Sequence, residues 1–169
     1  MATAAQGPAA RPPKIPESVL VVIHTDDLRV LLLERADRPG YWQSVTGSKD
    51  RLDEPADLTA RREVAEETGI VVGSGPVPLD ALLDWQQRNV YEIYPVWRHR
   101  YAPGVTHNTE HVFSLRVPAG LPIVLAPREH LQHAWLPWQE AAGRCFSPSN
   151  AQAIRELPQR VASRPPGWA

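Results

Sequence analysis

Short apolar runs rich in β-branched residues recur along the chain, and polar turn residues separate them. The first two, SVLVVIH (18–24) and RVLLLER (29–35), flank a Thr-Asp-Asp turn, so they predict a β-hairpin. The segment YWQSVTG (41–47) also has an extended pattern. Later segments of strand composition are LDALLDW (79–85), VYEIYPVW (90–97), EHVFSLRV (110–117) and PIVLA (122–126).

One stretch between these strands carries the signals of an amphipathic helix. Pro55 suits a first helical turn, and Gly69 suits a left-handed end. At about 100° per residue, one side of this helix collects Leu58, Arg61, Val64, Ala65 and Thr68. The opposite side collects Glu63, Glu66 and Glu67. We therefore expect the first side to pack on a sheet and the three carboxylates to form a cluster.

Two more helices are predicted near the C-terminus, for WLPWQEAAGR (135–144) and SNAQAIRELPQR (149–160). Strands on both sides of a helix favour an α/β sandwich, and 169 residues suit one domain with a sizeable core. We expect a disordered leader at 1–13, the domain at 14–158 and a loose tail at 159–169.

Composition and charge narrow the class of protein. The chain is 43% hydrophobic and 22% charged, as in soluble globular proteins. A net charge of −1 gives no basic field for nucleic acid or an anionic membrane, and no apolar run approaches the length of a membrane span. The single cysteine, Cys145, cannot form an internal disulfide, which favours a cytoplasmic location and a core role for this thiol.

The three clustered glutamates have two explanations. A solvated acidic face is the common one, and Arg62, one turn before Glu66, neutralises only part of the charge. The remaining negative charge raises pKa values or recruits a cation, and carboxylate oxygens suit hard divalent ions such as Mg²⁺. His107 and His111 lie in a turn and strand segment, so no zinc site is expected. Spacing alone leaves the metal site and the solvated face equally open.

The segment GSKDRLDEPADLTARREVAEETGI (47–70) resembles the Nudix box. That pattern is Gly, five residues, Glu, seven residues, then Arg-Glu-U-x-Glu-Glu-x-Gly-U, where U is apolar. From Glu54 onward the match has no gap. One departure is that six residues, rather than five, separate Gly47 from Glu54, and Asp53 restores this spacing only by lengthening the next interval. The extra residue falls in the loop before the helix, where insertions are tolerated.

The resemblance implies a Nudix fold, a mixed β-sheet sandwiched between α-helices, and hydrolysis of a diphosphate linked to another moiety. It implies that Glu63, Glu66 and Glu67 hold a divalent metal or serve as the catalytic base. The expected ion is Mg²⁺, with Mn²⁺ as an alternative. It also implies that Glu54 pairs with Arg62 and braces the loop against the helix.

Three segments resemble more closely one subfamily, the dihydroneopterin triphosphate diphosphatases of bacterial folate synthesis. They are SVLVVIH, YWQSVTGS and WRHRYAPGVTHNTEHVF, and the likeness extends from about Lys14 to about Ile154. This resemblance implies that Glu129 is a further metal ligand from outside the box. It implies substrate contacts at Lys14, Arg35, Thr46 and Ser147.

The expected partner is therefore a small-molecule triphosphate, and the oligomeric state stays open. The leading hypothesis is hydrolysis of dihydroneopterin triphosphate to the monophosphate and pyrophosphate. A nucleotide-cleaning enzyme acting on dATP or oxidised dGTP is the alternative, because pterin and guanine share a 2-amino-4-oxo pyrimidine edge. A non-catalytic Nudix-fold regulatory domain is the alternative from another class, and the presence of all three box glutamates argues against it.

Overall fold

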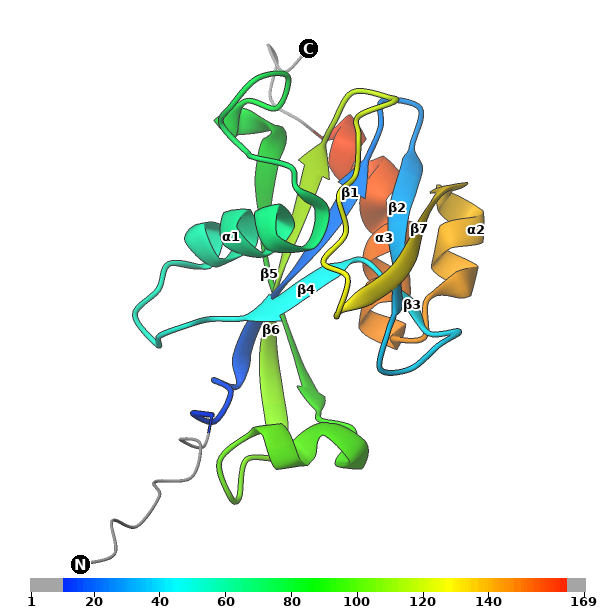
Figure 1. The fold of residues 1–169 in the computed structure, drawn as a ribbon. Helices are drawn as coiled ribbons and strands as arrows, with labels where there is room; N and C mark the ends of the chain where they lie inside the picture. The colour runs from blue at the N-terminus through cyan, green and yellow to red at the C-terminus, as the bar shows by residue number, and fades with distance from the viewer. Residues whose placement is uncertain (1–10, 164–169) are drawn as a thin grey trace, which may run out of the picture.

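The computed structural model describes residues 11–163, in which a seven-stranded sheet lies between helices (Figure 1). The strands are β1 (Glu17–His24), β2 (Arg29–Arg35), β3 (Trp42–Gln43), β4 (Val45–Ser48), β5 (Leu82–Glu92), β6 (His107–Arg116) and β7 (His130–Pro137). The helices are α1 (Ala56–Thr68), α2 (Trp138–Arg144) and α3 (Pro148–Ala162), with short 3₁₀ helices η1 (Leu79–Ala81) and η2 (Pro95–Arg100).

Strand β1 is the centre of the sheet. It runs parallel to β6 and antiparallel to β2 and β4, so the sheet is mixed, as predicted. Strand β4 pairs with β1 from Ser18 to Val21, whereas β2 meets β1 only at His24 and Val30. The predicted β1–β2 hairpin is therefore present but short, because two different strands share one edge of β1.

The continuous apolar run of β1 is explained by burial on both faces. Val19 and Val21 point into a core cluster that α1 completes with Ala60. Leu20 belongs to a second cluster, which α2 and α3 complete, for example with Ile154. Figure 1 shows α1 on one side of the sheet and α2 and α3 on the other. The α/β sandwich expected from the sequence is confirmed.

Three of the predicted strands differ from the structure. The segment 122–126 forms no strand; Ile123 and Leu125 pack against the α1 cluster, and the amide of the exposed Val124 donates to the Thr68 carbonyl at 2.8 Å. The two strands expected over 79–97 are one strand, β5, with an irregularity at Gln86, whose φ is 56°. Pro95 then starts η2 instead of extending the strand.

The C-terminal part of the structure also differs from the elements predicted for it. Residues 130–137 form β7, which pairs with β2. The sequence did not predict this strand because it lacks a regular alternation: Leu131, Gln132 and His133 are all exposed, whereas the next three residues are half-buried. The helix predicted over 135–144 therefore begins only at Trp138. The boundary expected after residue 158 lies inside α3, which continues through Pro158 because Val161 still packs on the second cluster.

The structure covers only part of the expected leader and tail. Of the expected leader, residues 1–10 lie outside the described residues, as do residues 164–169 of the expected tail. Within 11–163, no helix is both long enough and apolar enough to span a membrane.

Candidate functional site

Helix α1 presents its glutamates differently from the prediction. The helix ends at Gly69 with φ 76°, as expected, and the Gly69 amide donates to the Ala65 carbonyl at 2.9 Å. Leu58, expected to pack, is 44% exposed, whereas Thr59 is buried. Glu67, expected on the outer face, is only 4% exposed. The packed face is thus rotated toward Glu67, which places a carboxylate at the border between helix and sheet.

Arg62 connects this helix to the preceding loop. Its guanidinium donates to Glu54 at 2.9 Å, to the Ser48 carbonyl at 3.1 Å and to Glu63 at 2.9 Å, and it lies 3.6 Å from Glu66. Hydrogen bonding to Arg62 lowers the pKa of Glu54 to about 2. The Glu54–Arg62 pair implied by the resemblance is present, although the loop is one residue longer than the family pattern.

Gly47 allows Glu63 to lie against β4. A Cβ atom at Gly47 would come within 2.0 Å of the Glu63 carboxyl carbon, so any other residue would displace this carboxylate. Burial raises the pKa of Glu63 to about 7; Arg62 opposes the shift and the negative charge of Glu66 adds to it. The Glu63 carboxyl therefore has a pKa near physiological pH. Of the three box glutamates, Glu66 is the most exposed to solvent, with 55% of its side chain exposed.

Three side chains meet beside Glu63. Glu67, Glu129 and His130 each offer a ligand atom, and these atoms lie within 4.8 Å of one another. The Oε2 atom of Glu67 is buried without a hydrogen-bond partner, and so is Nδ1 of His130. Burial, with the charges of Glu63 and Glu129, raises the pKa of Glu67 well above its usual range. A carboxylate oxygen and an imidazole nitrogen that are both buried without a partner, among crowded carboxylates, fit a divalent cation.

His130 was missed by the sequence analysis. Burial, then the charge of Arg35, lowers its pKa to about 4, so the imidazole is neutral at physiological pH and able to accept. The available signal was its position next to Glu129. The two residues belong to a turn and a strand that the sequence did not reveal, so their convergence on α1 was not visible.

Positive side chains border the carboxylates. The Lys14 amide donates to the Arg100 carbonyl at 2.8 Å. Lys14 as a whole residue is exposed, but protein atoms around its ammonium group reduce the solvation of the charge and so lower its pKa. The positive charge of Arg100 lowers this pKa further, and the negative charges of Glu63 and Glu129 raise it. Lys14, on the chain entering β1, thus lies within electrostatic range of Glu63 and Glu129.

Arg35 has well-defined partners. Its Nε and Nη2 atoms both donate to Asp37 at 2.8 Å, and Nη1 donates to Gln43 at 3.1 Å. Arg100 also donates to Asp37, at 3.0 Å, and these two arginines lower the pKa of Asp37 to about 2. A phosphate bound through the same two nitrogens of Arg35 would have to displace Asp37.

The other predicted substrate contacts lie in two places. The Thr46 backbone hydrogen-bonds to Glu67, which lowers the pKa of that carboxyl in opposition to burial, so Thr46 belongs with the carboxylates. Ser147 is the N-cap of α3, and its Oγ accepts from the Asn150 amide at 3.5 Å. It adjoins Phe146, whose ring lies 5.8 Å from that of Trp97.

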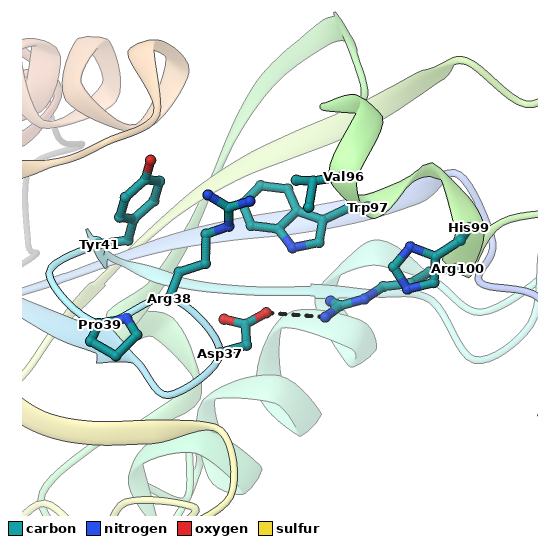
Figure 2. A pocket seen from close by; sticks show the side chains of 8 residues that line it. All are labelled: Asp37, Arg38, Pro39, Tyr41, Val96, Trp97, His99 and Arg100. Atoms are coloured by element: carbon teal, nitrogen blue, oxygen red, sulfur yellow. Dashed lines mark hydrogen bonds and ion pairs between the residues drawn. The ribbon is translucent and has the colours of Figure 1, made fainter.

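An open hollow of about 440 Å³ lies between the loop 37–41 and η2 (Figure 2). Trp97, Tyr41 and Arg38 line it, and none of them was a predicted site residue. The neighbouring Arg100 pairs with Asp37, which lies 63 residues before it in the chain, so the sequence alone did not predict this contact.

Comparison with known proteins identifies the fold. The NUDIX domain model matches residues 14–157. The chain belongs to the NUDIX-domain family. It is 46% identical over 145 residues to dihydroneopterin triphosphate diphosphatase of Escherichia coli K12, covering 85% of this chain and 93% of that protein. It is 40% identical over 141 residues to the Haemophilus influenzae protein of the same name, covering 83% of this chain and 85% of the relative.

A solved structure agrees with this NUDIX assignment. The E. coli dihydroneopterin triphosphate pyrophosphohydrolase superposes with a TM-score of 0.76 at 44% identity, covering 87% of this chain and 97% of that one. The Nudix fold expected from the box is therefore confirmed. A Caenorhabditis elegans Ap4A hydrolase, at 17% identity and a TM-score of 0.65, with 88% and 98% covered, shares the fold.

The raised pKa of Glu63 predicts how the stability of the metal-free NUDIX domain depends on pH. Below its ordinary value of 4.5, Glu63 is protonated in both states, and its favourable contribution is fully present; it is lost as pH rises through about 7. Relative to the parent, Glu63→Gln should therefore gain thermal stability between about pH 5 and pH 8, measured with chelator. The comparison with the parent is needed because the lowered pKa of His130 acts in the opposite direction over an overlapping range. A stability difference that is constant with pH would contradict the expectation.

Proposed function

We propose that this protein is a Mg²⁺-dependent pyrophosphohydrolase that converts dihydroneopterin triphosphate to dihydroneopterin monophosphate and pyrophosphate, a step of folate synthesis. The observation that carries the proposal is the group of Glu67, Glu129 and His130, two of which have a buried polar atom without a hydrogen-bond partner, beside an intact Nudix box. The relatives at 46% and 40% identity, both named for this substrate, support the choice of pterin.

The chain's own residues divide the work. Glu67 and Glu129 would hold the ion, with Glu63 close by and His130 as a neutral neighbour. Glu66 would add charge from the solvated side. A bound divalent ion neutralises phosphate oxygens and lowers the pKa of a coordinated water. A carboxylate of this cluster would take the proton of the attacking water, and Glu63, buried beside Glu67, is a candidate for that task.

The remaining predicted residues would position the triphosphate. The charges of Glu63 and Glu129 act on the Lys14 ammonium, so Lys14 would contribute positive charge near a phosphate held beside them. The positive charge of Arg35 likewise acts on Glu67 and on Lys14, and it lowers the pKa of both groups. Thr46 would present its side chain from β4 next to Glu67. The Glu54–Arg62 pair would keep the loop and helix in place without touching substrate.

Parallel hydrolysis assays test this function. We expect dihydroneopterin triphosphate to have the highest kcat/KM under equal Mg²⁺, with pyrophosphate as the product and weaker activity on dGTP and dATP. The shared pyrimidine edge limits discrimination against guanine, while rejection of less similar rings can be steep where buried polar groups would stay unpaired. A clearly higher kcat/KM for any ordinary nucleotide, or release of inorganic phosphate alone, would contradict the proposal.

A further inference from the structure

The hollow beside η2 has walls suited to a flat ring. Its rings come from separate parts of the chain: Tyr41 from the loop before β3, and Trp97 from η2. Behind them, Phe146 lies 5.1 Å from Tyr41 and 5.8 Å from Trp97 between ring centroids, and Tyr94 lies 5.5 Å from Trp97. Four aromatic side chains thus support one another at the surface, where a soluble protein gains little from exposing them.

A flat cation lies between the two outer rings. The guanidinium of Arg38 is 5.5 Å from the centre of the Tyr41 ring and 5.7 Å from that of Trp97. Figure 2 shows Arg38 extending between these side chains. A guanidinium and a heteroaromatic ring are both planar and both stack on aromatic faces. The space that Arg38 partly fills is therefore suited to a planar ring, with Arg38 itself free to cover its outer face.

The hollow adjoins the residues proposed to bind phosphate. The guanidinium of Arg35 lies 4.7 Å from the centre of the Trp97 ring. The charge of the same arginine acts on Lys14 and on Glu67. The backbone carbonyl of Arg100, which lines the hollow, accepts a hydrogen bond from the Lys14 amide at 2.8 Å. One substrate can thus extend from the carboxylates, past Arg35, to the aromatic walls.

We propose that this hollow is the ring-binding subsite, in which Trp97 stacks on the heteroaromatic ring of the triphosphate substrate and Tyr41 and Arg38 close over it. The inference rests on the proposed function, since it assigns the part of that substrate which the Nudix box leaves unspecified. Stacking accepts any π-face, so the subsite takes pterin and purine rings alike and supplies affinity rather than choice between them.

Kinetics of Trp97→Ala, with pyrophosphate as a ring-free inhibitor, tests the subsite. We expect the KM for dihydroneopterin triphosphate to rise by about 10-fold, within the range caused by loss of a stacked aromatic residue, and kcat to change little. The inhibition constant of pyrophosphate should stay unchanged, because pyrophosphate occupies only the metal and phosphate region. Trp97→Phe should restore most of the affinity, because it keeps a ring. Tyr41→Ala should reproduce the pattern without removing the ring under Arg35.

Two results would overturn the subsite. Equal weakening of substrate and pyrophosphate would show that Trp97 acts only through Arg35, and unchanged KM in both alanine variants would show that no ring stacks there. Neopterin, which has the ring and no phosphate, gives a reading without turnover: its binding by calorimetry should be lost in both alanine variants. If the parent instead prefers a nucleotide, the pterin assignment fails, while the same variants measured with that nucleotide still decide the subsite.

Discussion

Replacing Glu67 with glutamine is expected to lower kcat by about 10³-fold while the protein stays folded. The buried Oε2 of Glu67 has no hydrogen-bond partner in the protein, so this oxygen is available to a cation. Glutamine keeps the shape and removes that charge. Because burial raises the pKa of Glu67, folding disfavours its charged form, and the neutral amide should unfold at an equal or higher temperature at neutral pH in the absence of metal.

Glu140→Gln is the matched control for this change. Glu140 is an exposed helical glutamate on α2, paired at 3.8 Å with Arg144, and has no contact with the carboxylate cluster. It should keep the parent rate. Glu54→Gln gives the architectural comparison: it removes one partner of Arg62, so it should destabilise the loop more than it slows turnover. If Glu54→Gln and Glu67→Gln lose equal rates at matched stability, the division between support and chemistry is wrong.

Removal of divalent metal is expected to reduce hydrolysis to background, and Mg²⁺ or Mn²⁺ should restore it. The same ion should stabilise the fold, by about 2.7 kcal/mol at a concentration of 100 times its Kd, because only the folded chain brings Glu67, Glu129 and His130 together. Differential scanning calorimetry across a Mg²⁺ titration measures this. Full activity in a chelated sample, verified free of metal, would contradict the metal assignment.

Glu129→Gln separates the metal prediction from general electrostatics. If Glu129 is a ligand, the Mg²⁺ concentration that gives the half-maximal rate should rise at least about tenfold. Loss of a residue that only supports a metal ligand already lowers metal affinity by about 10- to 100-fold. Its stability without metal should change little, because the residue is exposed. Glu140→Gln again serves as the control. Kinetics identical to the parent across the titration would make Glu129 an ordinary turn residue.

The sequence by itself determined what local patterns and covalent spacing can determine. The β-branched runs defined β1, β2 and β6, and Pro55 and Gly69 set the ends of α1, since their backbone preferences act within a few residues. The uninterrupted spacing from Glu54 to Ile70 identified the family. Because Glu54 and Arg62 belong to one loop and helix, their pairing also followed from that spacing.

Only the tertiary structure decided which side chains far apart in the chain meet. Helical periodicity placed Glu67 on the solvent-exposed face of α1, but packing of α1 against the sheet buried it. A prediction that assigns charged residues to the exposed face misses a carboxylate that lies at the border between helix and sheet. Strand β7 was not predicted because three consecutive exposed residues interrupt the alternation expected of a strand, so the approach of His130 to Glu67 was not predicted either. The ring-lined hollow depends on segments more than 50 residues apart, at Tyr41 and Trp97, and no local pattern encodes their contact with Arg38. Periodicity reports an element's own geometry, whereas these contacts arise only after the elements pack.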